Sequence, residues 1–372
     1  MKKDIDASQL SVFIFIAVMA LKIFLAPGLL IKNSGRDGWI SMLIFVAIEL
    51  AILLVILFII KLNPDKTLYE VLVSALGKIV AKIVLVVVVA LLGVKLIMML
   101  GELKLFFNTE ILKSIDFTVC LIVLLFMLTV FAAKGLNPIG RMSQIFFPFI
   151  LVALGILFFL TAGNIDLKGL LPVVFEPKEI LGTLNKFPLW FGDVAVLLIF
   201  TGKVKMRKKF VLKGLVGAAV SSLAVMYFAV VLFETYGDYP NIIDYGHNIS
   251  NMVVYSSGRY LFGRFDMPIF CIWMISIFIQ IIITFYAIVS FLVDIVGKGN
   301  NTIWGAVLAL VMFILCQFIF DSKSNLFELG TGPARWLCLA VEVVLPILLL
   351  VISLIGRRKK NEDDSRKESS DT

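Results

Sequence analysis

The sequence predicts an all-α membrane protein with ten transmembrane helices. Of its 372 residues, 60% are hydrophobic and 16% are charged, and the mean hydropathy is +1.04. Soluble proteins are about 45 to 50% apolar and about 25% charged. The apolar stretches are continuous and rich in Leu, Ala, Phe and Met, whereas the strands of a membrane barrel alternate between apolar and polar residues. A bundle of membrane helices is therefore expected.

The ten expected spans are apolar stretches of roughly the 17 to 25 residues that cross a bilayer, separated by charged or Gly/Pro-rich connections. They cover residues 9–31, 38–61, 83–107, 117–133, 139–161, 178–202, 210–234, 266–296, 301–320 and 334–356. Residues 1–356 are therefore expected to form one transmembrane domain. The charged, Ser-rich residues 357–372 are expected to be a disordered tail.

The first and sixth spans contain residues that interrupt helices. The first contains Leu25-Ala26-Pro27-Gly28-Leu29, and the sixth contains Phe187-Pro188-Leu189-Trp190-Phe191-Gly192-Asp193. Backbone groups released inside a membrane must be buried against protein or line a polar cavity. Because the two interruptions occupy corresponding places in the two halves of the chain, they predict a binding site near the midplane.

Two connections have a predicted structure of their own. After the second span, Asn63-Pro64 stops a helix, and a capping box from Thr67 to Glu70 begins a short amphipathic stretch. Residues 242–261 carry spaced apolar residues among polar ones, so we expect an interfacial helix there.

The loop charges predict the orientation. Twenty-one Lys and Arg residues fall on the side of the two termini and eleven on the other side, so both termini are expected to be cytoplasmic. The basic cluster from Lys203 to Lys209 is explained by attraction to anionic lipid, without nucleic acid. The four cysteines have no metal-ligand spacing, so neither a metal site nor a disulfide is expected.

Charged residues inside the spans are the candidate functional residues, namely Lys22, Glu49, Lys95, Asp193 and Glu342. A charge in hydrocarbon is costly, so each should face the bundle interior with a partner. Lys22 and Asp193 fall near the midplane, about 20 Å along their helices. They are read either as ligand-binding groups or as an internal ion pair that fixes the packing. Glu49 and Lys95 are expected to form a structural pair.

Tryptophans divide into two groups. Trp39, Trp273, Trp304 and Trp336 lie toward the ends of spans and are interpreted as interfacial anchors. Trp190 adjoins the interruption at Gly192, and it is interpreted either as the wall of a ligand pocket or as core packing.

Both interruptions resemble motifs of the amino acid/polyamine/organocation transporters. The run Ile23-Phe24-Leu25-Ala26-Pro27 resembles the end of their first-helix signature, Gly-Ser-Gly-(Ile/Val)-Phe-Leu-x-Pro. Residues 187–193 resemble their sixth-helix pattern of aromatics before a Gly and an acidic residue.

A more specific resemblance, from about residue 5 to 298, is to the spore germination permease family, the B subunits of GerA-type nutrient germinant receptors. It rests on the order and spacing of Gln9, Pro27, Gly38-Trp39, Asn63-Pro64, Thr67, Glu70, Gly77-Lys78, Gly135, Pro138, Gly140-Arg141, Leu170-Leu171-Pro172, Gly263-Arg264-Phe265-Asp266 and Trp273.

This resemblance implies a LeuT-like fold, in which spans one to five and six to ten form an inverted repeat with broken helices 1 and 6. It also implies a location in the spore inner membrane, a small nutrient such as an amino acid as ligand, and A-type and lipoprotein C-type subunits as partners. The implied ligand site lies between helices 1 and 6. The candidate ligand-binding residues are Lys22, Ile23, Pro27, Trp190, Gly192 and Asp193, with Glu49 and Lys95 as polar support.

The sequence departs from the transporter signature at Ala20-Leu21-Lys22, where Gly-Ser-Gly would expose bare backbone N–H groups. Our hypothesis is that the Lys22 ammonium replaces either the backbone contact to a ligand carboxylate or a coupling cation. Asp193 would then be its counter-ion while the site is empty.

The sequence is compatible with three functions. The favoured one is a receptor subunit, in which nutrient binding shifts the bundle between two packings. The second is an amino acid or organocation transporter coupled to H⁺ or Na⁺ through Asp193 or Glu49. The third is a structural subunit with a vestigial pocket. We expect no enzymatic activity and no cofactor, because no nucleophile and base occur at usable spacing.

Overall fold

A computed structural model of the chain describes residues 5–22, 26–108, 116–162, 177–205, 209–236, 266–320 and 328–355. Within these ranges the regular structure is helical apart from two short strands. The first half comprises β1 (Ile5–Asp6), α1 (Ala7–Met19), α2 (Ala26–Ser34), η1 (Gly35–Asp37), α3 (Gly38–Leu62), α4 (Leu68–Phe106), α5 (Phe117–Lys134) and α6 (Leu136–Ala162). The second half comprises α7 (Pro177–Lys186), η4 (Pro188–Trp190), η5 (Asp193–Phe200), β2 (Val204–Lys205), α8 (Phe210–Tyr236), α10 (Asp266–Val296), α11 (Asn301–Ile319), α13 (Ala334–Leu339) and η6 (Ala340–Val344).

Eight helices in the described part of the chain are long and apolar enough to cross a membrane. The last of them runs from Ala334 to Ile355 and contains η6, a π-helical segment. The first and sixth expected spans are divided instead, into α1 and α2 and into α7, η4 and η5. The helical membrane fold with two broken segments is therefore confirmed, whereas the count of ten spans is not.

The first break lies earlier than the sequence indicated. Helix α1 ends at Met19 and α2 begins at Ala26, so Pro27 and Gly28 belong to α2. A proline in the first turn of a helix removes an N–H that has no intrahelical partner there. Pro27 therefore starts the second half-helix. The expected break at residues 25–29 is corrected, because residues 26–29 are helical and a turn follows α1 at residues 20–22.

The capping box before α4 is confirmed. The Thr67 N–H donates to Glu70 Oε2 at 2.7 Å, and the Glu70 N–H donates to Thr67 Oγ1 at 3.2 Å. The helix that follows runs through the expected amphipathic stretch into the third span, with a kink at Gly77. Gly77 has a φ of +80°, a conformation that is cheap only for glycine, so it separates the two parts.

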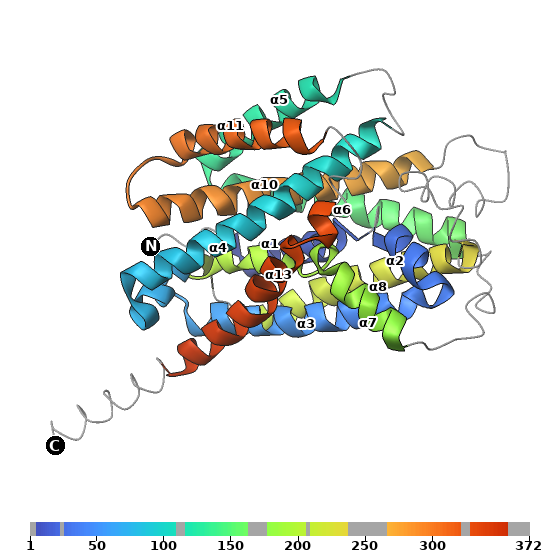
Figure 1. Ribbon diagram of the computed structural model, residues 1–372, viewed down its shortest axis with the longest axis horizontal. Coiled ribbons are helices and arrows are strands. Elements are labelled where there is room, and N and C mark those ends of the chain that lie inside the picture. Colours follow the sequence, from blue (N-terminus) through green and yellow to red (C-terminus); the bar gives the residue numbers. More distant parts are fainter. Residues whose placement is uncertain are drawn as a thin grey trace.

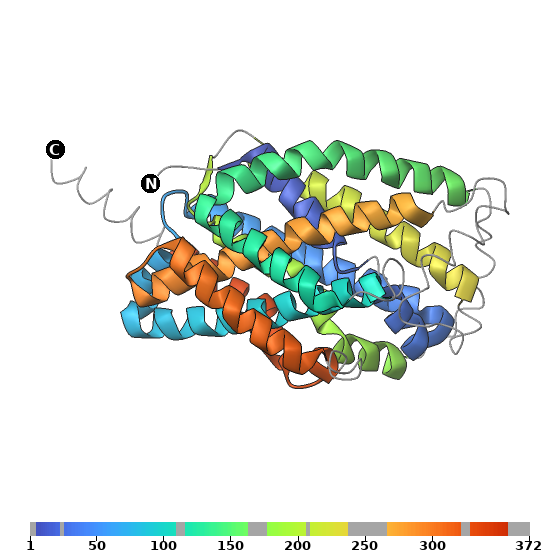
Figure 2. The same ribbon diagram turned by 90° about the horizontal axis from the view of Figure 1, so that it is seen from above.

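The helices pack as one bundle. Helices α5 and α11 lie side by side (Figure 1), and α6 lies along α10 (Figure 2). Helix α1 packs against α8, and α10 packs against α4. Elements from the two halves are thus interleaved, so each broken segment is enclosed by helices of both halves.

The start of the first broken segment is hydrogen-bonded to the end of the second. Strands β1 and β2 are parallel, with Ile5 opposite Val204 and Asp6 opposite Lys205. The Ile5 N–H also donates to the Lys203 carbonyl at 3.2 Å. The backbone just before α1 is therefore hydrogen-bonded to the backbone just after η5, a contact that the all-α expectation did not include.

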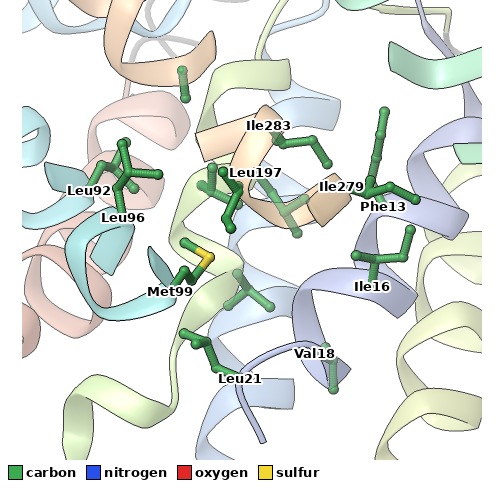
Figure 3. Packing of buried hydrophobic residues seen from close by; sticks show 14 of the residues in the cluster. Phe13, Ile16, Val18, Leu21, Leu92, Leu96, Met99, Leu197, Ile279 and Ile283 are labelled. Atoms are coloured by element: carbon green, nitrogen blue, oxygen red, sulfur yellow. The ribbon is translucent and has the colours of Figure 1, made fainter. Parts of the chain in front are cut away.

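Most of the buried interior of the bundle is apolar. Side chains from α1, α4, η5 and α10 point toward one another, among them Phe13, Leu96, Leu197 and Ile279 (Figure 3). The outer surfaces of the long helices are also apolar, with side chains such as Phe126 and Phe159 70% and 81% exposed. An apolar exterior of this extent is typical of a surface that faces lipid. The expected interfacial helix at 242–261 and tail at 357–372 lie outside the described residues.

Candidate functional site

Five charged side chains form a continuous buried chain of ion pairs. Lys22 Nζ lies 2.9 Å from Glu49 Oε1 and 3.0 Å from Asp193 Oδ2. The second oxygen of Asp193, Oδ1, lies 2.9 Å from Lys95 Nζ, which also pairs with Glu342 Oε1. All five side chains are at most 4% exposed. We call this set, Glu49, Lys22, Asp193, Lys95 and Glu342, the ion-pair chain.

The ion-pair chain connects the two breaks with the helices around them. Lys22 follows α1 at the first break, and Asp193 begins η5 at the second. The other members come from α3, α4 and η6. Burial of isolated charges in hydrocarbon would be prohibitive, so each ammonium lies between two carboxylates. This arrangement confirms the contact between Lys22 and Asp193.

One expectation about the ion-pair chain is corrected, and one member was left out of the expected site. Glu49 and Lys95 do not pair with each other, since Glu49 contacts Lys22 and Lys95 contacts Asp193 and Glu342. Glu342 was expected to face the bundle interior with a partner, and it does, but it was not among the ligand-binding or polar-support residues. Its position inside an apolar span was the signal that could have included it.

Side chains also satisfy the carbonyl groups that the breaks release. The Trp273 indole Nε1 donates to the Ala20 carbonyl at 3.1 Å. The Lys95 ammonium donates to the Phe191 carbonyl at 2.8 Å. Trp273 is 1% exposed, so its interpretation as an interfacial anchor is wrong. Both contacts satisfy backbone groups that could not face lipid unpaired.

Gly192 permits the close approach of η6 to the second break. Its φ is +77°, in the left-handed region. A Cβ atom at this position would collide with the Glu342 carboxylate. A side chain at Gly192 would therefore be both strained and in the place of a member of the ion-pair chain.

Trp190 is part of the core beside the ion-pair chain. Its side chain is 1% exposed, and its indole Nε1 donates to Glu102 Oε1 at 2.9 Å. Its ring packs closely on Gly330, where a Cβ atom would collide with it. Of the two interpretations made from the sequence, core packing describes these contacts. The bond to Glu102 was not expected.

Two candidate ligand-binding residues, Pro27 and Ile23, remain. Pro27 is buried in the first turn of α2. Ile23 lies outside the described residues. Their role in ligand binding stays a prediction, as does that of Lys22, Trp190, Gly192 and Asp193.

A cavity of about 280 Å³ lies between α3, α7, the second break and the final helix. Its polar lining consists of Glu49, Asn185, Cys338 and Glu342, and Gly192 also borders it. The Cys338 thiol donates to Glu342 Oε2 at 2.9 Å. The cavity thus reaches both ends of the ion-pair chain, whereas Lys22, Asp193 and Trp190 do not line it.

Comparison with protein families and curated proteins gives a consistent result. A family model described as "Spore germination protein" matches residues 4–325. Spore germination protein YndE of Bacillus subtilis (strain 168) is 22% identical over 359 residues, covering 95% of this chain and 97% of YndE. The putative spore germination protein YfkT of the same strain is 26% identical over 353 residues, covering 90% of this chain and 93% of YfkT.

Comparison with solved structures identifies the fold. MhsT in complex with L-phenylalanine has a TM-score of 0.62 at 13% identity, covering 93% of this chain and 97% of MhsT. The nucleobase-cation-symport-1 family transporter MHP1 has a TM-score of 0.62 at 12% identity, covering 94% of this chain and 78% of MHP1. A manganese transporter of Eremococcus coleocola has a TM-score of 0.63 at 12% identity, covering 92% and 78%. The chain has the LeuT-like fold of these transporters.

Proposed function

The chain belongs to the spore germination protein family, and from this premise we propose that it is the membrane subunit of a nutrient germinant receptor. It is a multi-pass helical membrane protein with a transporter fold. In the proposed function, a small nutrient such as an amino acid binds between the two broken segments and triggers germination.

The observation that carries this proposal is the contact between Lys22 and Asp193. These residues place an ammonium and a carboxylate side by side, one at each break. A zwitterionic amino acid can replace this internal pair, because its carboxylate matches Lys22 and its ammonium matches Asp193. The two charges of the ligand then take over contacts that the protein otherwise makes with itself.

Such a replacement would favour a second packing of the bundle. Lys22 also holds Glu49 on α3, and Asp193 also holds Lys95 on α4. A ligand between Lys22 and Asp193 separates the two segments while each remains attached to its own neighbour. A ligand with different affinities for the two packings shifts the population between them. Partner subunits of the A type and the lipoprotein C type would read this shift.

The location belongs to the same proposal. We place the chain in the spore inner membrane with both termini in the cytoplasm, as the distribution of Lys and Arg in the loops favours. Anionic lipid near the basic cluster from Lys203 to Lys209 would support this orientation.

The proposal is tested with spores that carry Lys22→Met as the only copy of the chain. The nutrient concentration for half-maximal germination should rise roughly tenfold or more, because a charge-assisted contact to the ligand carboxylate is lost. Lys178→Met, at an exposed position of α7, is the matched control and should leave it unchanged. An unchanged dose response at equal protein level in the spore membrane would refute the role of Lys22.

The runner-up function is an ion-coupled transporter of amino acids or organic cations. The fold shared with MhsT and MHP1 favours it. Vesicles reconstituted with this chain alone separate the two functions. Saturable uptake of labelled amino acid would support transport, whereas nutrient binding without net uptake supports the receptor.

A further inference from the structure

The cavity beside the ion-pair chain has an apolar wall and an acidic end. Apolar side chains of α3, α7 and the final helix form the wall, and Ile48 and Leu181 at its mouth are 44% and 64% exposed. The mouth therefore opens on the outer surface of the bundle. Glu49 and Glu342, 1% and 3% exposed, form the inner end.

Glu49 has an unused acceptor at this end. Its Oε1 atom binds Lys22, whereas Oε2 is buried and has no hydrogen-bond partner among the described residues. A buried carboxylate oxygen without a donor costs free energy, and such atoms are rare unless something binds them. The described residues that line the cavity include no Lys, Arg or His.

With all three of its carboxylates ionised, the ion-pair chain has one more negative than positive charge. It contains three carboxylates but only two ammonium groups, those of Lys22 and Lys95. A single additional cation at Glu49 would balance it. Nowhere among the described residues do three His, Cys, Asp or Glu side chains gather so that they could hold a metal ion. An ammonium group, which needs acceptors but no fixed coordination sphere, fits this end better.

The rest of the cavity suits an apolar body. Phe45 and Phe191 line it as a stacked pair, with ring centroids 3.9 Å apart. Aromatic faces attract cations as well as apolar groups. A volume of about 280 Å³ is near the lower limit of small-molecule sites, so the occupant must be small.

We propose that this cavity binds a small organic cation, with one ammonium group at Glu49 Oε2 and an apolar body between α3, α7 and the final helix. This site is separate from the proposed nutrient site. A zwitterion would also bring a carboxylate into the cavity, where the described lining residues include no cation to receive it. Because Glu49 also holds Lys22, an occupant would act directly on the residue proposed to receive the nutrient.

The test measures binding to the purified full chain in lipid nanodiscs by isothermal titration calorimetry, with empty nanodiscs as the blank. The probes are hexylammonium, its uncharged analogue hexan-1-ol and the zwitterion 6-aminohexanoate. Hexylammonium should bind saturably and at least roughly tenfold more tightly than either of the others, because only it pairs a single cation with the buried carboxylate.

Three variants locate the site. Glu49→Gln should weaken hexylammonium binding roughly tenfold or more, since the charge of the acceptor is removed. Val343→Phe should weaken it by filling the cavity while leaving every ion pair in place. Glu179→Gln, which removes an exposed carboxylate from the neighbouring α7, is the matched control and should bind as the unmodified chain does.

Several results would overturn the proposal. These are equal binding of hexylammonium and hexan-1-ol, unchanged binding by Val343→Phe, or complete competition by the same concentration of Na⁺ or K⁺. Each binding measurement is made without nutrient, so a negative result does not contradict the proposed function. The Lys22→Met germination test can likewise fail without affecting the binding result.

Discussion

The Lys22 ammonium lies 3.0 Å from Asp193 Oδ2, and this contact joins the two breaks although the residues are 171 positions apart in the sequence. Each of the two residues has a second ion-pair partner, because Lys22 also pairs with Glu49 and Asp193 also pairs with Lys95. The contact is therefore a place where the bundle can exchange partners without leaving a charge unpaired.

The energetic coupling of Lys22 and Asp193 is measurable by a double-mutant cycle. Lys22→Met and Asp193→Leu each leave a buried charge with one partner fewer, a type of change that costs about 3–5 kcal/mol. The double variant should lose less stability than the sum of the single variants. Thermal unfolding of the purified protein in one detergent measures all four forms. Additive losses would mean that the two residues do not interact.

Gly192→Ala should be severe, since alanine would need a positive φ and its Cβ would collide with Glu342. We expect a large fall in the unfolding temperature and in the yield of folded protein. Gly182→Ala in the adjacent α7 is the control. A Cβ at Gly182 meets nothing within 4 Å, and alanine favours helix there by about 1 kcal/mol. Equal effects of the two substitutions would contradict the close approach at Gly192.

The hydrogen bond from Trp190 to Glu102 is tested by Trp190→Phe. This change leaves Glu102 Oε1 buried without its donor, at a cost of about 1–3 kcal/mol beyond the lost packing. Glu102→Leu in the same background should recover part of the loss, because the unpaired acceptor is then gone. The unfolding temperatures of the single and double variants measure this recovery. If the double variant recovers no stability, the whole effect of Trp190→Phe comes from lost packing.

Asp116 gives a prediction for the pH dependence of stability outside the spans. Its side chain accepts the Thr118 N–H at 2.9 Å at the start of α5, and this backbone hydrogen bond lowers the pKa of the carboxyl group. A carboxyl with a lowered pKa in the folded state stabilises that state above its unfolded pKa of about 3.9. The contribution is lost as the pH falls through the folded pKa.

Asp116→Asn keeps a helix cap but cannot titrate in this range. The unfolding temperature of this variant should therefore fall less steeply than that of the unmodified chain as the pH decreases below about 4. Thermal unfolding at stepped pH values measures both slopes. Identical slopes would show that the Asp116 cap does not contribute to the acid dependence.

Much of the fold was predictable because membrane spans are long, continuous and apolar. The sequence predicted the bundle, both broken segments and the capping box at Thr67. The first break was placed too late, because Pro27 was interpreted as the interruption although a proline is favourable at a helix start. The strands β1 and β2 were missed because two residues are too few to show alternation.

The charged residues of the site could be predicted from the sequence, but which of them contact each other could not. Depth along a helix indicated that Lys22 and Asp193 could meet, and they do. Depth does not indicate the direction around the helix axis, and apolar residues surround α3 on all sides, so the partner of Glu49 could not be chosen. Trp273 was misassigned for a similar reason, since a tryptophan near a span end can face lipid or an unpaired carbonyl.

The strand pair of β1 and β2 restricts how the two broken segments can move. Their residues Ile5 and Val204 are joined through the backbone at one end of the bundle, whereas the contact between Lys22 and Asp193 further in is made by side chains alone. The backbone pairing of the strands would act as a fixed hinge, whereas the ion pair can exchange its partners. A ligand that replaces the ion pair between Lys22 and Asp193 would let the two broken segments separate, and the separation would be largest at the end away from the strands.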